Sequence, residues 1–474
     1  MARHIPTQTD VLIVGAGPTG VALALSLAQL GVDYVIIDTL SSSADGTRAA
    51  SMQPRTLEYL RRLGLAEAMI DDGLKGRGFA VADFDRELLR LSYDTIDSPY
   101  PFLLLIGQWQ TQANLERRLH DVGGAVLRGV RLVDLQDEFP GSAATVVDSD
   151  GRPHIINARY VAGCDGLHSR VRTLAGIGFP GESPAEMFAV ADIRFDGWPS
   201  DRVGTVFSLS PHGMLVSSPL PGDVVRVVGS VPPGTAAPTA SDVAELIEAR
   251  GSSWMRCGTV CEVVSSSVYS VYERVASKFR HGNTFLLGDA AHTHSPAGGQ
   301  GMNTGIQDAG NLAWKLAHVL AYDAPEFLLD TYEAERRPNA QRLIQFTHQI
   351  VQVATISDPH ARRMRNDILA VVQQVPGVTE MLSRRLSQID IGYSATDEPF
   401  SAGSRVNPEL IGAHDLSWSL VCPNGPPPAV PPALSVTVSP DLAHPVAVRP
   451  DGIVASTEMV TQLFGFALDP PGVR

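Results

Sequence analysis

A glycine-rich turn between two apolar segments near the N-terminus constrains the fold most strongly. The turn is Gly15-Ala16-Gly17-Pro18-Thr19-Gly20; the β-branched run Val11–Val14 precedes it, and a helical pattern over Thr19–Leu30 follows. In a βαβ unit the first glycine permits a tight bend, the second lets a pyrophosphate approach the backbone, and the third lets helix and strand pack closely. The next predicted strand, Tyr34–Ile37, ends at Asp38, whose carboxylate is placed to hold a ribose hydroxyl. The pattern predicts a dinucleotide site, and the acidic Asp38 favours FAD or NAD, whose adenosine ribose carries no phosphate.

A second glycine-rich segment favours FAD over NAD. It follows a strand predicted over Thr284–Leu287, opens with Gly288-Asp289, and continues through Pro296 to Gly299-Gln300-Gly301-Met302-Asn303 at the start of a predicted helix. A carboxylate at a strand end can bind a polyol hydroxyl, and backbone N–H groups at a helix start suit an anionic ring or a phosphate. A flavin offers both partners, in its ribityl chain and its reduced ring. The alternative is an ordinary helix cap, which is disfavoured by four glycines in and just after the turn: Gly298, Gly299, Gly301 and Gly305.

Composition excludes several classes of protein. The formal net charge of −14 argues against a nucleic-acid partner and an anionic membrane surface. No apolar run reaches the roughly 18 residues of a membrane-spanning helix, and the N-terminus lacks the apolar core of a signal peptide. We therefore expect a cytoplasmic protein. No histidine cluster accompanies the four cysteines, so we expect buried free thiols and no metal site: Cys164, Cys257, Cys261 and Cys422.

The chain of 474 residues is long enough for several packed units. We predict a mixed α/β fold in which a Rossmann-like FAD-binding domain, residues 1–180 and 280–398, is interleaved with an antiparallel-sheet substrate domain, residues 181–279. Short β-rich pieces separated by Pro-Gly turns support the second assignment: Gly204–Ser210, Met214–Ser218 and Val224–Val231. Helices are predicted over Gly301–Tyr322, Tyr332–Val353 and Pro359–Val372. A small C-terminal lobe, residues 399–474, has predicted strands at Leu434–Val438 and Val446–Arg449.

Two longer segments resemble one family closely. GDAAHTHSPAGGQGMNTGIQDAGNLAWKLA, from Gly288 to Ala317, and LLDTYEAERRP, from Leu328 to Pro338, resemble the class A flavoprotein aromatic monooxygenases, the para-hydroxybenzoate hydroxylase-like family. The most similar branch holds phenol, resorcinol and 3-(3-hydroxyphenyl)propionate hydroxylases and polyketide-tailoring oxygenases. The resemblance covers residues 8 to 350. It returns in the tail, which is similar to a shortened thioredoxin-like domain without Cys-x-x-Cys, so packing or assembly is its expected role.

The resemblance implies a role for each matching residue. The turn residues would bind the FAD pyrophosphate, Asp38 the ribose and Asp289 the ribityl chain. Pro296 would lie against the reactive flavin edge, and Gly299 to Asn303 would supply backbone donors. Arg48, in Thr47-Arg48-Ala49, would lie near the flavin; with Pro296 it is the candidate catalytic residue. Further FAD or NAD(P)H contacts are implied for Gln108, Asp165 and Gly166.

Some of these residues have ordinary alternatives. Arg48 could be a surface arginine, Gln108 a helix cap, and Asp165-Gly166 a turn. His292 and His294 are expected to be structural.

The resemblance also implies the chemistry. NAD(P)H would reduce FAD, dioxygen would form a flavin C4a-hydroperoxide, and an aromatic substrate held over the middle domain would be hydroxylated. None of Tyr269, Tyr272, His212 and Arg226 stands out as a base. A Baeyer–Villiger-type oxygenase or a flavin oxidase on the same fold, and a non-catalytic flavin-binding protein, are the alternatives. The substrate, the choice between NADH and NADPH, and the oligomeric state stay open, and a homodimer is compatible with the sequence.

Overall fold

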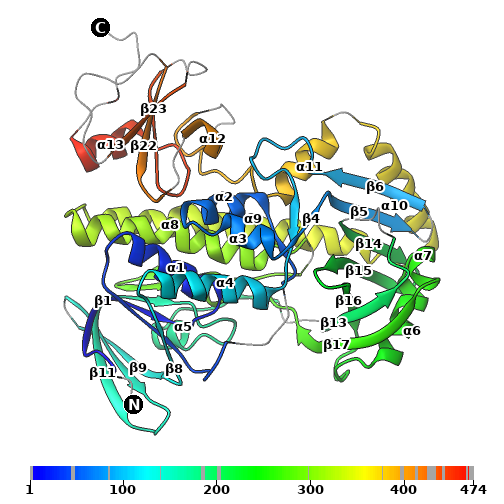
Figure 1. Cartoon of the computed structure of the whole chain (residues 1–474), viewed down its shortest axis with the longest axis horizontal. Helices are drawn as coiled ribbons and strands as arrows, with labels where there is room; N and C mark the ends of the chain where they lie inside the picture. The colour runs from blue at the N-terminus through cyan, green and yellow to red at the C-terminus, as the bar shows by residue number, and fades with distance from the viewer. Residues whose placement is uncertain are drawn as a thin grey trace.

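The structure is a computed structural model. It describes residues 4–43, 49–83, 86–138, 140–182, 187–199, 204–296, 298–375, 377–394, 400–411, 415–423, 434–439, 444–465 and 468. In Figure 1, two long helices cross the middle of the molecule; the N-terminal sheet lies below them, a second sheet lies to the right, and the C-terminal lobe lies above. No described helix is long and apolar enough to cross a membrane.

The N-terminal sheet is largely parallel. Its main path is β19-β20-β11-β1-β2-β8, and β10 and β9 extend it by pairing antiparallel from β11. The strands are β1 (Gln8–Val14), β2 (Tyr34–Asp38), β8 (Val126–Arg128), β9 (Arg131–Glu138), β10 (Gly141–Val147), β11 (Pro153–Gly163), β19 (Arg280–His281) and β20 (Thr284–Leu286). Val11 to Val14 of β1 are fully buried or nearly so, as expected for a strand covered on both faces. Parallel strands β1, β11 and β20 end side by side, which gathers both glycine-rich segments at one edge of the sheet.

The second sheet has seven strands in the order β17-β13-β16-β15-β14-β5-β6. Five come from the predicted substrate segment: β13 (Met187–Asp196), β14 (Thr205–Ser210), β15 (Gly213–Leu220), β16 (Val224–Val231) and β17 (Thr259–Ser270). The other two come from before it: β5 (Gly78–Asp83) and β6 (Arg86–Ser92). All neighbours pair antiparallel except β14 and β5, which pair parallel. The antiparallel sheet is therefore present, with one parallel junction where the two segments meet. Helices α6 (Ala240–Arg250) and α7 (Ser253–Arg256) follow β16.

Helices connect the two sheets. The two long ones are α8 (Gly301–Ala321) and α9 (Phe327–Ala354). Helix α8 packs closely on α1 (Pro18–Gln29) because Gly305 has no side chain; a Cβ there would lie 2.3 Å from Thr19 Oγ1. The shorter helices are α2 (Pro54–Arg62), α3 (Ala66–Asp71), α4 (Gln108–Asp121), α5 (Arg170–Leu174), α10 (Pro359–Val372) and α11 (Val378–Leu386). Helix α5 packs on the N-terminal sheet, and α10 and α11 pack on β6 of the second sheet.

The C-terminal lobe is a three-stranded sheet with a helix. Strand β22 (Trp418–Cys422) pairs parallel with β23 (Leu434–Val438) and antiparallel with β24 (Val446–Val448), and α13 (Thr457–Phe464) follows. A buried ionic cluster docks the lobe onto α9: Arg449 donates to both carboxylate oxygens of Glu335, at 2.6 and 2.9 Å, and Lys315 contacts the same carboxylate at 2.9 Å. Burial lowers the pKa of Lys315 to about 8, and Glu335 offsets part of that effect.

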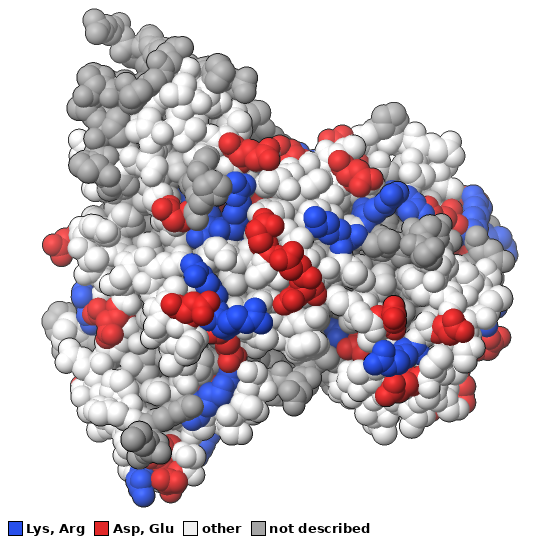
Figure 2. Space-filling view, viewed as in Figure 1, with Lys and Arg blue, Asp and Glu red and all other residues white. Residues whose placement is uncertain are grey.

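The cysteines correct one expectation. All four are free, but only Cys422 is buried; Cys164 is half-buried, Cys257 is exposed at the end of α7, and Cys261 is exposed on β17. On the face drawn in Figure 2, acidic and basic side chains are intermixed.

Candidate active site

The first glycine-rich turn joins β1 to α1, and each glycine has a distinct environment. Gly15 has φ of +101°, and a Cβ there would lie 2.4 Å from the Cys164 carbonyl oxygen. A Cβ on Gly20 would lie 2.0 Å from the Gly15 carbonyl oxygen, so this glycine permits close packing of helix and strand. At Gly17 no described atom beyond its neighbours lies within 4 Å of an added Cβ. Gly17 therefore leaves open space at the start of α1, where the helix presents its first N–H groups.

Asp38 braces this turn from the end of β2. Its two carboxylate oxygens accept hydrogen bonds from the backbone N–H groups of Ala16, at 2.7 Å, and Leu40, at 2.8 Å. Gln112 on α4 donates to the Ala16 carbonyl oxygen at 2.7 Å. A carboxylate has lone pairs for more than two donors, so Asp38 keeps acceptor capacity for a hydroxyl group.

A buried carboxylate, that of Asp308, holds the Gly288-Asp289 turn in place; the sequence alone did not indicate this role. Asp308 on α8 accepts from Gly288 N at 3.1 Å, from Arg336 Nε at 2.6 Å, and pairs with His292 Nε2 at 2.8 Å. Burial by itself would raise the pKa of Asp308, but the positive Arg336 and the neighbouring His292 hold it below its ordinary value. His292 is thus paired with a buried carboxylate behind the turn, and the turn presents Asp289 toward the cavity.

Hydrogen bonds connect the first turn of α8 and the loop before it to strand β3 (Ser51–Met52). Asn303 accepts from Gln53 N at 2.8 Å and donates to the carbonyl oxygens of Ser51, at 3.0 Å, and Gly299, at 2.8 Å. Gly299 has φ of +62°, and a Cβ there would lie 2.0 Å from Ser51 Oγ. The carboxamide of Gln300 points toward α11, where it contacts Leu386 O at 3.0 Å. The Asn303 and Gln300 side chains thus shape the loop, which leaves the backbone N–H groups at the start of α8 and the side chains of Pro296 and Met302 to meet a cofactor.

The next two predicted contact residues are Arg48 and Gln108. Arg48 lies outside the described residues. Gln108 is the first residue of α4, and its Oε1 accepts from Ala49 N at 3.1 Å, so it holds the segment that follows Arg48.

The carboxylate of Asp165 accepts hydrogen bonds from within its own loop. It accepts from Ser169 Oγ at 2.5 Å, Arg170 N at 2.6 Å and Val171 N at 3.0 Å, which caps helix α5. Gly166 adopts φ of +77° in the same turn.

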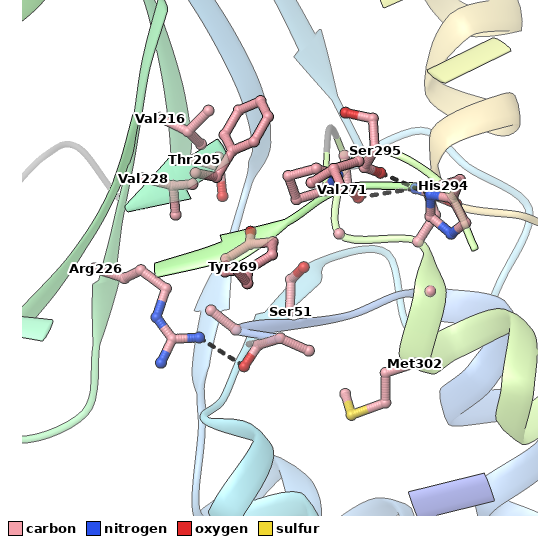
Figure 3. Close-up of a pocket in the computed structure, with 18 of the residues that line it drawn as sticks. Ser51, Thr205, Val216, Arg226, Val228, Tyr269, Val271, His294, Ser295 and Met302 are labelled. Atoms are coloured by element: carbon pink, nitrogen blue, oxygen red, sulfur yellow. Dashed lines mark hydrogen bonds between the residues drawn. The ribbon is translucent and has the colours of Figure 1, made fainter. Parts of the chain in front are cut away.

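A cavity lies between this loop and the second sheet. Its empty volume is about 1250 Å³, part of which is open solvent at the mouth. One side is formed by Asp289, Pro296 and Gly298 to Met302; the opposite side is apolar and aromatic: Phe79, Phe188, Phe207, Met214, Val216, Val228 and Tyr269. Figure 3 shows Thr205, Val216, Val228 and Tyr269 facing Ser51 and Met302 across this space. A planar molecule on the sheet side would thus lie next to the predicted flavin edge.

Three polar side chains of the cavity wall form hydrogen bonds with their neighbours: Thr205, Ser218 and Arg226. Thr205 and Ser218 share a hydrogen bond of 2.8 Å between their hydroxyl groups. Arg226 on β16 binds Asp192 on β13 through Nε and Nη2, and its Nη1 donates to the Ala49 carbonyl oxygen at 2.7 Å, the bond drawn in Figure 3. Arg226 therefore ties the second sheet to the segment that follows Arg48.

His294 also lines the cavity. Its Nδ1 lies 2.6 Å from the Ser295 carbonyl oxygen and so carries the proton, whereas Nε2 has no hydrogen-bond partner among the described residues. Burial, with a smaller effect of His292, lowers the pKa of His294 to about 4. The imidazole is therefore neutral at pH 7.

These features fit FAD. Gly17 leaves room for a pyrophosphate at the start of α1, Asp38 can accept a ribose hydroxyl, and Asp289 stands at the edge of the cavity. The start of α8 offers backbone N–H groups and the positive end of its dipole to an electron-rich ring. Within the described residues, no group of three or more His, Cys, Asp or Glu side chains could hold a metal ion.

Comparison with known proteins gives the same assignment. Residues 8–347 match the family model described as FAD binding domain. This chain belongs to that FAD-binding family. It is 34% identical over 415 residues to 12-dehydrotetracycline 5-monooxygenase/anhydrotetracycline 6-monooxygenase of Streptomyces rimosus, covering 85% of this chain and 80% of that protein. It is 30% identical over 472 residues to pentachlorophenol 4-monooxygenase of Sphingobium chlorophenolicum, covering 94% and 87%.

A solved structure agrees. The anhydrotetracycline hydroxylase OxyS from Streptomyces rimosus superposes with a TM-score of 0.81 at 28% identity, covering 97% of this chain and 100% of that one. The predicted fold class, the FAD cofactor and the assignment as a flavin-dependent aromatic monooxygenase are confirmed. The individual site residues, the domain boundaries and the use of NAD(P)H stay predictions.

Proposed function

We propose that this monooxygenase uses NAD(P)H and dioxygen to hydroxylate a planar, polycyclic phenolic substrate. The observation that carries the proposal is that one cavity is lined both by Pro296 and Gly298 to Met302 and by the aromatic wall of the second sheet. The aromatic side chains of Phe79, Phe207 and Tyr269 on that wall offer several rings against which a planar ligand can pack. The S. rimosus relative is named for anhydrotetracycline, which supports a multi-ring substrate, whereas the relative named for pentachlorophenol supports a smaller one.

Each part of the chain has a defined task. FAD, when bound, supplies the redox chemistry that activates dioxygen. The first turn and Asp38 anchor its adenosine end, Asp289 holds its ribityl chain, and the start of α8 orients its ring. Phe207 and Phe79, with centroids 5.8 Å apart, build an apolar wall that excludes water beside the reacting atoms. Arg226, held by Asp192 and by Ala49, fixes the wall relative to the flavin side.

The test is anaerobic reduction of the flavin by NADPH or NADH, with and without a panel of single-ring and polycyclic phenols. We expect a polycyclic phenol to accelerate bleaching of the flavin absorbance most strongly. In air, the product should gain one oxygen atom as a ring hydroxyl. An ester or lactone product would instead indicate Baeyer–Villiger chemistry, and peroxide release without oxygenated product would indicate an oxidase. A yellow protein that neither nicotinamide reduces would indicate a flavin-binding role.

A further inference from the structure

The cavity wall contains an arginine, Arg226, whose positive charge is neutralised by the carboxylate of Asp192 on the neighbouring strand. Among the described residues that line the cavity, Arg226 is the only Lys or Arg. Its Nε and Nη2 donate to the two carboxylate oxygens of Asp192 at 2.7 and 2.8 Å, so the contact is bidentate. The side chains of Arg226 and Asp192 are 3% and 8% exposed. The pair therefore contributes no net charge to the cavity.

The hydrogen-bonding capacity of Arg226 is only partly used. A guanidinium has five N–H groups; two bind Asp192 and a third, on Nη1, binds the Ala49 carbonyl oxygen. The remaining two, one on each terminal nitrogen, can donate to an uncharged oxygen such as a phenol hydroxyl or a quinone carbonyl. A ligand carboxylate, in contrast, would lose its water shell and meet a cation that is already neutralised.

We propose that Asp192 makes this cavity select uncharged ring systems over carboxylated ones, with a phenolic or quinone oxygen of the substrate placed at Arg226. Asp192 is thus a specificity-determining residue that acts through Arg226 and does not touch the substrate itself. The inference rests on the proposed function and adds the charge class of the substrate. The preference for uncharged ligands would then be set by strands β13 and β16, on which Asp192 and Arg226 lie directly opposite each other.

The experiment compares two ligands that share a ring system and differ by one carboxylate, 2-naphthol and 6-hydroxy-2-naphthoate. Dissociation constants are measured at pH 7 from the perturbation of the flavin absorbance of the oxidised holoenzyme. Rates of anaerobic reduction by NADPH are measured beside them. For the wild-type enzyme we expect 2-naphthol to bind at least about tenfold more tightly, because only the carboxylate carries a desolvation penalty.

Two variants separate the charge from the shape of the pair. Asp192→Asn keeps one hydrogen-bond acceptor for Arg226 but removes the negative charge that neutralises the guanidinium. The ratio of dissociation constants that favours 2-naphthol should therefore fall to about threefold or less. The double variant Asp192→Asn/Arg226→Gln has no charge at either position and should regain the wild-type preference. The double variant also shows whether a change in Asp192→Asn arises from charge or from a disturbed fold.

The outcomes distinguish this inference from the function on which it rests. If the wild-type enzyme binds the carboxylate as tightly as 2-naphthol, or if Asp192→Asn leaves the ratio unchanged, the role of Asp192 is wrong while the hydroxylase proposal stands. If no polycyclic phenol of the panel binds or accelerates reduction, the proposed function fails and this inference fails with it.

Discussion

Replacement of Gly17 by alanine should separate the binding of FAD from the stability of the fold. Gly17 has φ of −72° and ψ of 180°, an extended conformation that any residue adopts. An added Cβ meets no described atom within 4 Å. The methyl group would therefore be tolerated by the protein without FAD, but it would occupy the space through which a pyrophosphate reaches the start of α1.

The expected magnitudes follow from this geometry. A glycine-to-alanine change at a compatible position stabilises by about 0.4–1 kcal/mol through the unfolded chain. Loss of a glycine at the N-cap offsets this by a few tenths of a kcal/mol or more. The free energy of unfolding without FAD should therefore change by less than about 1 kcal/mol. Forcing a methyl group into a filled site costs about 1–3 kcal/mol, so the dissociation constant of FAD should rise by roughly 5- to 150-fold.

Titration of the flavin-free protein with FAD, followed by flavin fluorescence, measures the affinity, and urea unfolding measures the stability. The matched control is Gly15→Ala, where φ of +101° and a Cβ 2.4 Å from the Cys164 carbonyl oxygen should destabilise the fold itself. The reasoning is refuted if Gly17→Ala binds FAD within twofold of the wild type. It is also refuted if Gly17→Ala, without FAD, loses as much stability as Gly15→Ala.

Three further perturbations test other parts of the structure. Asp308→Asn leaves Arg336 as a buried cation with a weaker partner and should lower the free energy of unfolding by about 3–5 kcal/mol; a change below about 1 kcal/mol in urea unfolding would contradict the role of Asp308. His318 on α8 accepts a hydrogen bond from Trp418 Nε1 at 2.7 Å, and burial lowers its pKa to about 4. Because the pKa in the unfolded chain is near 6.5, the free energy of unfolding should fall by about 2 kcal/mol between neutral pH and pH 5, as the unfolded state binds a proton that the folded state does not. In urea unfolding, the difference in stability between wild type and His318→Gln should therefore narrow as the pH falls, and parallel pH profiles would rule this out. Phe207→Ala removes part of the aromatic wall and should weaken substrate binding about tenfold while leaving FAD affinity unchanged; equal losses for both ligands would place the residue elsewhere in the mechanism.

Local patterns in the sequence predicted many elements closely. Strands Val224–Val231 and Leu434–Val438 and helix Pro359–Val372 have the bounds that were predicted. Helix α9 starts earlier than predicted, at Phe327, and continues through Pro338. These segments have strong periodicity or clear turn residues at their ends, which is the information that a local pattern carries.

Contacts between distant segments could not be predicted in the same way. Asp308 looks like any polar residue in a helix, and its role appears only when the fold brings Gly288, His292 and Arg336 around it. The pairing of Arg226 with Asp192 likewise depends on the register of β16 against β13. The glycine turns were predictable because their function depends on backbone conformation at neighbouring positions, whereas these ion pairs depend on tertiary structure.

The parallel junction between β14 and β5 has a consequence for synthesis of the chain. The hairpin of β5 and β6, residues 78–92, leaves the ribosome long before residues 205–210 of β14 exist to cover its open edge. At typical elongation rates this interval lasts roughly ten seconds, and an unpaired strand edge is a site of misassociation. Nascent chains should therefore be most sensitive to chaperone depletion in this window. Exchange of the substrate sheet between relatives would have to transfer both segments together, because neither completes the sheet alone.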